Sequence, residues 1–423
     1  MFDWFVPLFI TLIVILAASL IRFRFDFMEP AIIFVATLTF SVSMAMIFAE
    51  RWQLSIGLRT FFCLTFAALA FVGGSVFAEK CSRARSIGKK KSAPRIGNMK
   101  IALTLLVMLA LLIFNFIECY EMSLELGNAG GVADMIRVNR AAIEAQKASF
   151  SRWLNYRSML AQAITCIFFY VFARNFIELR AVRLKYLLPL LFYIPILILS
   201  TGRMGLLCLV VYMVVVASII YQNRRGQSIA IRLSTAKALL GAGLIFAVLF
   251  MLMGFFTGKT VSETRTPAVI IAHYAGLSIP ALDVFLNREI VETPLIGSQT
   301  LHGVYRAFNS LGIALPRVPL FLPFVHFYNI DTNVYTAEAR YIHDYGWLGM
   351  SIILWSFGAI YAFAYRYVRD RASTVPLMFY GVCAYPLFLS SIDERVMLDL
   401  FSTTPIYMLI LLWLGNRILV RDD

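Results

Sequence analysis

The amino-acid sequence predicts an all-α integral membrane protein with about eleven transmembrane helices. Of its 423 residues, 60% are hydrophobic and only 15% are charged, and the mean hydropathy is +0.78. A soluble domain of this size could not bury so many apolar side chains in one core, so lipid must solvate part of the surface. The apolar residues form runs close to the roughly 20 residues that an α-helix needs to cross a hydrocarbon core of about 30 Å.

Eleven runs meet this criterion, and together they form one polytopic domain that covers residues 1–423. The first run lacks a preceding basic segment and a small-residue cleavage site, so we interpret it as a retained helix and not as a signal peptide. The predicted transmembrane helices are 3–20, 30–48, 58–78, 101–118, 158–178, 186–200, 204–221, 236–256, 345–365, 375–390 and 403–418.

The loops between these runs carry the positive charge and predict the orientation. Loop 79–100 contains eight lysine and arginine residues, and a short loop this basic is expected to stay in the cytoplasm. Alternation from this loop places the other cationic loop clusters in the cytoplasm as well. The N-terminus is then periplasmic and the C-terminus cytoplasmic. We therefore attribute the net charge of +14 to membrane orientation and expect no nucleic-acid partner.

Two long extracytoplasmic loops follow from this topology. Loop 119–157 contains an amphipathic pattern near residues 132–150, which predicts a helix that either covers the membrane surface as a lid or packs on the bundle. Loop 257–344 is the longest segment that cannot span, and its apolar stretch 267–286 predicts short packed helices or a re-entrant segment. All four histidines lie in this second loop: His273, His302, His326 and His343. We therefore predict that it is the catalytic loop.

Loop 257–344 ends in a dense run of polar and ionisable residues. Arg340, His343 and Asp344 have the i, i+3, i+4 spacing that places side chains on one face of a helix. The alternative is an interfacial cluster in which Arg340 pairs with Asp344 and His343 faces water. We favour a polar pocket because further hydrogen-bonding side chains precede this cluster, namely Asn333, Tyr335 and Thr336.

Arginine side chains predict an anion site at the outer surface. Arg203 lies in a glycine-containing turn between two short apolar runs, where it either lines a site or extends to lipid phosphate, and the two interpretations are equally supported. Arg265 and Arg340 lie in loop 257–344, and a guanidinium fork suits bidentate phosphate binding. The sequence has no P-loop, H-E-x-x-H or G-x-S-x-G motif and no metal-binding carboxylate cluster, so we expect no metal or cofactor.

Two segments resemble a known family. Asn333-Val334-Tyr335-Thr336, followed by Asp344-Tyr345-Gly346-Trp347-Leu348-Gly349, resembles the N-x-Y-T … D-[FY]-G-x-x-G pattern of Wzy-type O-antigen and oligosaccharide repeat-unit polymerases. Gly297-Ser298-Gln299-Thr300-Leu301 and the Arg203 turn are similar to further segments of that family. The resemblance implies a glycosyltransferase at the periplasmic face of the bacterial inner membrane. It would join undecaprenyl-pyrophosphate-linked oligosaccharide repeats into a surface polysaccharide, such as that of lipopolysaccharide.

The resemblance also implies roles and partners. Arg203, Arg265 and Arg340 would bind the substrate, with Arg203 and Arg340 on the donor pyrophosphate. His343 or Asp344 would act as the base or orient it, and Asn333, Tyr335 and Thr336 would shape the sugar site. The expected partners are the lipid-linked oligosaccharide, membrane lipids and a chain-length regulator protein.

Two alternative functions remain open from the sequence. An O-antigen ligase would use the same donor but pass the glycan to lipid A-core. A flippase for lipid-linked glycans would need cationic residues inside a central cavity, whereas the charges here lie in loops and at the ends of the predicted helices. The middles of those helices contain almost no Asp, Glu or Lys, which argues against ion-coupled transport.

Overall fold

The computed structural model of the chain is an all-α protein with one short β-hairpin. It describes residues 3–82, 94–127, 130–145, 147–200, 204–225, 241, 267–288, 296–313, 322–371 and 373–420. The elements are α1 (Phe5–Arg22), α2 (Pro30–Ile47), α3 (Ala49–Trp52), α4 (Leu58–Cys81), α5 (Asn98–Glu125), α6 (Val132–Glu144), α7 (Arg152–Leu179), the 3₁₀ turn η1 (Leu184–Leu187), α8 (Leu188–Leu199), α9 (Met204–Arg225), α11 (Pro267–Gly276), α12 (Ser278–Asn287), α13 (His302–Ser310), β1 (Val325–Phe327), β2 (Ile330–Thr332), α14 (Ala337–Arg371), α15 (Thr374–Cys383), α16 (Tyr385–Leu389), the π-helical turn η2 (Val396–Leu400) and α17 (Thr403–Leu419).

Eight helices in the described part are long and apolar enough to cross a membrane. Seven of them are α1, α2, α4, α5, α7, α9 and α14, and three shorter apolar stretches are Leu184–Leu199, Thr374–Leu389 and Thr403–Leu419. Together these ten overlap ten of the eleven predicted spans. Of the remaining predicted span, 236–256, the structure describes residue 241 alone, so the count of eleven stays a prediction.

The eighth apolar stretch, Val269–Asn287, falls within the predicted loop 257–344. It consists of α11 and α12, each ten residues long, so only the two helices taken together, over 19 residues, reach the length of a membrane span. α11 packs against α2, and α12 packs against α4 and α14. The short helices expected from the apolar pattern at 267–286 are thus present.

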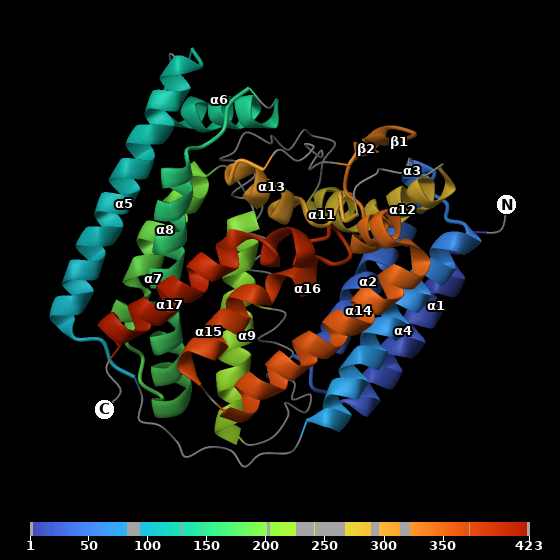
Figure 1. The fold of residues 1–423 in the computed structure, drawn as a ribbon, viewed down its shortest axis with the longest axis horizontal. Coiled ribbons are helices and arrows are strands. Elements are labelled where there is room, and N and C mark those ends of the chain that lie inside the picture. Colours follow the sequence, from blue (N-terminus) through green and yellow to red (C-terminus); the bar gives the residue numbers. More distant parts are fainter. Residues whose placement is uncertain are drawn as a thin grey trace.

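Short elements gather at one end of the bundle. In Figure 1, α6, α11, α12, α13 and the β1–β2 hairpin lie at the top, whereas the C-terminus of α4 and the N-terminus of α5 lie toward the opposite end. These two termini flank the basic loop that was predicted to be cytoplasmic. α6 ends at Glu144 and not near residue 150, and it packs against α5.

A buried polar network joins the helices at the end opposite α6. Asp26, in the loop between α1 and α2, accepts hydrogen bonds from Gln222 Nε2 (2.8 Å) and from the Tyr365 hydroxyl (2.7 Å). Glu29 pairs with Arg366, with Oε1 3.0 Å from Nη2. The α1–α2 loop is thereby fixed to the C-terminal ends of both α9 and α14.

α4 and α14 pack side by side at two glycines. A Cβ added at Gly74 would lie 1.9 Å from the Trp355 carbonyl oxygen, and one added at Gly358 would lie 2.2 Å from the Phe71 carbonyl oxygen. Such small residues allow helix backbones to approach closely inside a membrane. This contact holds α14, and the polar segment at its N-terminus, in a fixed position relative to α4.

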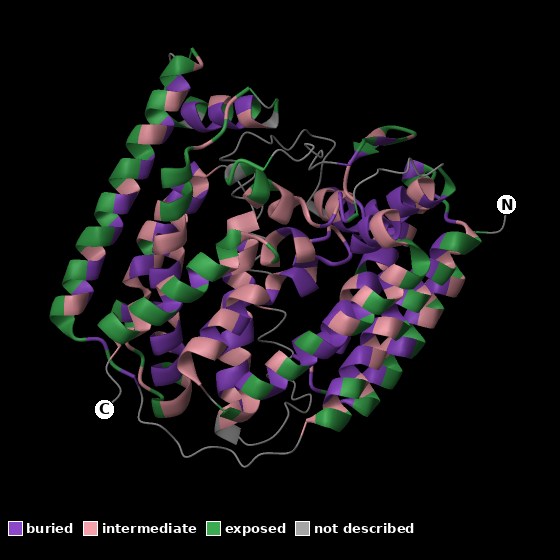
Figure 2. Cartoon of the chain, in the orientation of Figure 1, coloured by how far each residue is buried: buried purple, intermediate pink, exposed green. Residues whose placement is uncertain are grey.

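The outward faces of the helices are exposed although their side chains are apolar (Figure 2). Examples are Val14, Leu106 and Phe114, which are 61%, 64% and 58% exposed. Soluble monomers do not expose large contiguous apolar surface. These faces therefore suit contact with lipid, in agreement with a membrane protein.

Candidate functional site

A break in α14 creates the local geometry of the candidate site. Gly346 has φ 67° and ψ −175°, a backbone conformation that glycine adopts without steric cost. The helical segment 337–345 therefore ends at this glycine, and the membrane-length part of α14 begins just after it. The polar run that ends loop 257–344 is thus a separate short helix on top of α14.

The Asp344 carboxylate binds a turn that lies more than forty residues earlier. Its side chain is fully buried and accepts hydrogen bonds from the backbone N–H groups of Gln299 (2.9 Å) and Thr300 (2.8 Å). The hydroxyls of Thr300 (2.8 Å) and Ser298 (3.2 Å) also donate to it. The G-x-x-T-L and D-Y-G-x-x-G segments, distant in sequence, are therefore in direct contact.

His343 and Asp344 form a close pair. His343 Nδ1 lies 2.9 Å from Asp344 Oδ1, and an ionised carboxylate can only accept, so Nδ1 carries the proton in this pair. The imidazole is 11% exposed, and its Nε2 makes no hydrogen bond with any described residue. The Phe285 ring of α12 lies beside it, with centroids 6.4 Å apart. The buried carboxylate thus orients a mostly buried imidazole, and a neutral imidazole with the proton on Nδ1 can accept a proton at Nε2.

Arg340 links the same turn to a third segment. Its Nη1 donates to the Gln299 backbone oxygen (3.2 Å) and to the Gln299 side-chain oxygen (3.1 Å), and its Nε lies 3.7 Å from Asp393 Oδ1. Asp393 in turn pairs with Arg395 at 2.8 Å. The alternative predicted from sequence paired Arg340 with Asp344. In the structure the carboxylate of Asp344 is held by His343 and the turn, and Arg340 lies against Asp393.

The segment 390–400 was not predicted to belong to the site. Glu394 is fully buried and accepts hydrogen bonds from the Tyr341 hydroxyl (2.7 Å) and the Met397 backbone N–H (2.7 Å). Burial raises the pKa of the Glu394 carboxyl to about 7. A signal existed in the sequence, because Asp393-Glu394-Arg395 is a run of three ionisable residues between two apolar spans, on the side predicted to be periplasmic.

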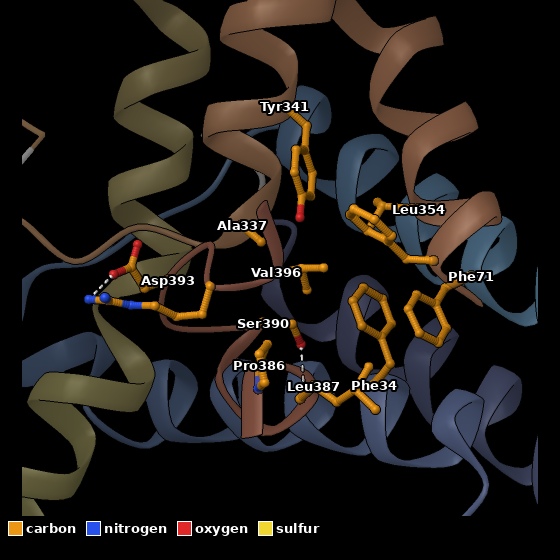
Figure 3. Close-up of a pocket in the computed structure, with 12 residues that line it drawn as sticks. Phe34, Phe71, Ala337, Tyr341, Leu354, Pro386, Leu387, Ser390, Asp393 and Val396 are labelled. Carbon is orange, nitrogen blue, oxygen red and sulfur yellow. Dashed lines mark hydrogen bonds and ion pairs between the residues drawn. The ribbon is translucent and has the colours of Figure 1, made fainter. Parts of the chain in front are cut away.

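Apolar side chains leave only a very small cavity beside Tyr341 and Asp393. Figure 3 shows Tyr341 and Asp393 at a cavity of about 10 Å³, with Phe34 and Phe71 on its other side. A cavity of this volume holds about one water molecule, so no sugar can enter there. His343 does not line this cavity.

The structure places the other predicted site residues differently. Tyr335 is 2% exposed, its hydroxyl donates to the Pro323 carbonyl (2.8 Å), and its ring lies against Phe285. Thr336 is also buried, whereas Asn333 is partly exposed. Tyr335 and Thr336 are thus buried structural residues and do not face an open site. Arg203 and Arg265 lie outside the described residues.

A second histidine–carboxylate pair lies on the β-hairpin. His326 Nδ1 is 2.7 Å from Asp331 Oδ1, and both side chains are more than half exposed. The pair faces an open hollow of about 440 Å³ that is also lined by His273 and Tyr328. Because neither partner is buried, this pair lacks the fixed carboxylate that distinguishes His343–Asp344.

Comparison with known proteins adds no family to this description. No family model, no curated protein and no solved structure matches the chain. The fold and the site define a membrane-type helical bundle with a histidine–aspartate pair and an arginine–carboxylate cluster at one end. Function therefore has to be argued from the chemistry of that site.

Proposed function

We propose that this protein is a glycosyltransferase that polymerises undecaprenyl-pyrophosphate-linked oligosaccharide repeat units at the periplasmic face of the bacterial inner membrane. The observation that carries the proposal is the His343–Asp344 pair, which the 297–301 turn clamps at the end of the bundle opposite the basic loop. A polar site at that end suits a substrate whose sugars lie outside the membrane and whose tail lies within it.

His343 acts as the general base in this proposal. A hydroxyl at the non-reducing end of a new repeat attacks the anomeric carbon of the growing chain, and its proton passes to His343 Nε2. The bond between that carbon and the pyrophosphate oxygen breaks, and undecaprenyl pyrophosphate leaves. Asp344 holds the imidazole in orientation and stabilises the imidazolium that forms.

Cationic groups near the pair stabilise the departing pyrophosphate. Arg340 lies on the same short helix as His343, and Arg395, whose side chain is 26% exposed, lies beside the shared carboxylate of Asp393. Arginine stabilises such charge well because its planar fork can bind two phosphate oxygens. We add Arg395 to the residues predicted from sequence, and we retain Arg203 and Arg265 as candidate ligands for the same group.

The alternatives differ in how well the described residues support them. A flippase is expected to place cations in a central cavity, whereas the ion pairs described here lie toward the ends of the bundle, as with Glu29–Arg366 and Arg395–Asp393. An O-antigen ligase would use the same base and the same leaving group. The N-x-Y-T and D-Y-G-x-x-G resemblance favours the polymerase.

Analysis of lipid-linked glycans in a deletion strain tests the proposal. Loss of a polymerase leaves single repeats on lipid A-core, loss of a ligase leaves long chains on undecaprenyl pyrophosphate, and loss of a flippase leaves single repeats facing the cytoplasm. We expect the first result, with rescue by the wild-type gene and none by His343→Gln at equal membrane level. Long chains of normal abundance in the deletion strain would contradict the proposal.

A further inference from the structure

A shallow, open groove lies on the surface where α4 meets α14, at the end of α14 that carries the His343–Asp344 pair. Its volume is about 410 Å³, and much of it is open to the surroundings of the protein. The apolar side chains that line it are 39–49% exposed. The lining residues are Leu58, Arg59, Phe62 and Phe66 of α4 and Trp347 of α14.

Arg59 supplies the one charge in this lining. It is exposed on the first turn of α4, and its Nη1 donates to the Leu286 carbonyl at 3.0 Å. A guanidinium has five N–H donors, so this bond leaves most of the fork able to bind an anion. Asp283 of α12 fixes this end of α4 by accepting from the Gly57 N–H (2.7 Å) and the Thr60 hydroxyl (2.6 Å).

The groove and the proposed catalytic pair share a boundary. Leu286, which binds Arg59, follows Phe285, and the Phe285 ring lies beside the His343 imidazole. On the other side, Trp347 follows His343 by four residues across the break at Gly346. The C-terminal turn of α12 thus contacts both Arg59 and His343.

We propose that this groove seats the first isoprene units of the polyprenyl donor, with Arg59 bound to its pyrophosphate. The inference rests on the proposed function, because the anomeric carbon must lie near His343 while the lipid tail stays in the bilayer. The apolar lining matches the hydrocarbon tail, and the cation at one end matches the phosphate. A phospholipid kept permanently in the groove would block this approach, so we commit to the polyprenyl donor as the occupant.

Direct binding to the purified full-length protein tests this occupant. The variants are Arg59→Gln and the double substitution Phe62→Ala/Phe66→Ala, with Phe114→Ala, 58% exposed on α5, as the matched control. Native mass spectrometry with undecaprenyl pyrophosphate should show affinity reduced roughly tenfold in both groove variants and unchanged in the control. Melting temperatures near that of the wild type establish that the variants are folded.

Two binding results would overturn the inference. Unchanged affinity for undecaprenyl pyrophosphate in both groove variants would show that the groove does not bind the donor. An equal loss of affinity for phosphatidylglycerol would make the groove a general lipid contact.

Measurements of turnover with donors of different tail length distinguish two outcomes: that the groove does not bind the donor, or that the protein is not a polymerase. Wild-type protein should have a lower KM for an undecaprenyl-linked donor than for a geranyl-linked one, and the ratio of the two KM values should approach one in Phe62→Ala/Phe66→Ala. A ratio that persists in this variant contradicts the groove but not the polymerase. No turnover of either donor by the wild type contradicts the polymerase, and the binding result then decides the groove.

Discussion

At the scale of single residues, the structure gives His343 and Asp344 different surroundings. The sequence alone could not decide which of these two neighbours is the candidate base. The Asp344 side chain is fully buried and accepts several hydrogen bonds from the 298–300 turn, whereas the His343 side chain is 11% exposed. A carboxylate surrounded by donors is poorly placed to take a proton from substrate. The imidazole is better placed, so our first prediction concerns His343.

His343→Gln should lower polymerisation by roughly 10²–10⁴-fold, because glutamine keeps a hydrogen-bonding group but cannot act as a base. Turnover of lipid-linked repeats by purified protein measures the effect. A near-normal rate in His343→Gln would move the base elsewhere, with His273 and Asp331 as the next candidates.

Asp344→Asn should reduce stability as well as activity. Asparagine offers one acceptor oxygen where the carboxylate offers two, so in either orientation its NH₂ faces groups that now donate to Asp344. A buried donor left unsatisfied costs about 1–3 kcal/mol. Asp331→Asn is the control, because the exposed His326–Asp331 pair is worth about 0–1 kcal/mol. Melting temperatures in detergent compare the two variants, and equal small changes would contradict the structural role of Asp344.

Sequence reasoning found part of this site and missed its partners for a physical reason. The i, i+3, i+4 rule identifies neighbours on one helix, and the structure does place Arg340, His343 and Asp344 on one helical segment. It says nothing of Thr300 or Asp393, which reach the same helix from segments far away in the chain. Such contacts depend on tertiary packing, so periodicity alone could not have assigned them.

At the scale of elements, the pairing of α4 with α14 positions the site relative to the groove. Both helices contribute to the groove, and Gly74 and Gly358 set their separation. The pattern of apolar residues predicted the two helices well, because a membrane span needs a long apolar run. Their direct contact was not predicted, since glycines within an apolar run do not reveal which neighbour they face.

Gly74→Ala should destabilise the protein by about 1–3 kcal/mol, the usual cost of overpacking, because the new Cβ would lie 1.9 Å from the Trp355 carbonyl oxygen. Gly73→Ala is the matched control, since its Cβ would lie 3.5 Å from a Trp355 ring carbon, an ordinary contact. Thermal melting and the amount of membrane-inserted protein measure the effect. Equal behaviour of the two variants would contradict the close approach of α4 and α14.

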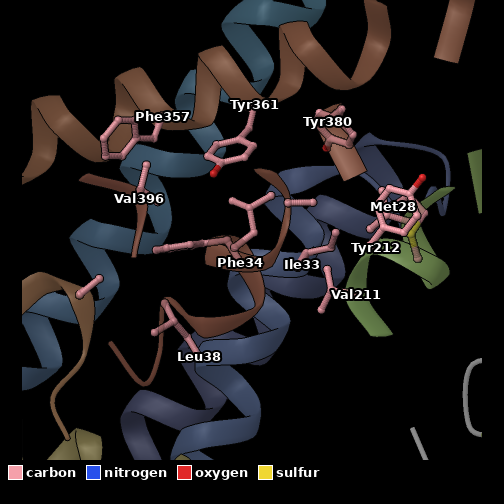
Figure 4. Close-up of a cluster of buried hydrophobic side chains, with 14 of the residues drawn as sticks. Met28, Ile33, Phe34, Leu38, Val211, Tyr212, Phe357, Tyr361, Tyr380 and Val396 are labelled. Carbon is pink, nitrogen blue, oxygen red and sulfur yellow. The ribbon is translucent and has the colours of Figure 1, made fainter. Parts of the chain in front are cut away.

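At the scale of the whole molecule, an apolar interior separates two polar ends. Figure 4 shows Phe34, Leu38, Tyr212, Phe357 and Val396 meeting in this interior from α2, α9, α14 and η2. The Asp26–Glu29 network lies at one end and the His343–Asp344 pair lies toward the other. This division agrees with a chain that performs its chemistry at one membrane face and is anchored at the other.

The anchoring network should make stability depend on pH. Burial raises the pKa of Glu29, in the loop before α2, from 4.5 to about 8, although Arg366 lowers it. The folded state therefore keeps a proton that the unfolded state releases, so this contribution to stability is complete below pH 4.5 and is lost as pH rises to about 8. The melting temperature of the wild type should fall between pH 5 and 8, and the fall should be smaller in Glu29→Gln, which cannot ionise. Identical slopes would exclude Glu29 as a source of the dependence.

The orientation of the bundle is the prediction on which the proposed function depends most. Reporter fusions after Ser92 and Gly226 should give cytoplasmic signals, because the adjoining loops are basic and basic loops stay inside. Fusions after Gly130 and Ser298 should give periplasmic signals, since these residues shortly precede α6 and α13 in the chain, and both helices lie at the end opposite the C-terminus of α4. Alkaline phosphatase and green fluorescent protein fusions report opposite compartments, and each site should respond to one of them only. A periplasmic signal at Ser92 would place His343 in the cytoplasm, away from a lipid-linked donor that is used outside, and would remove the polymerase proposal.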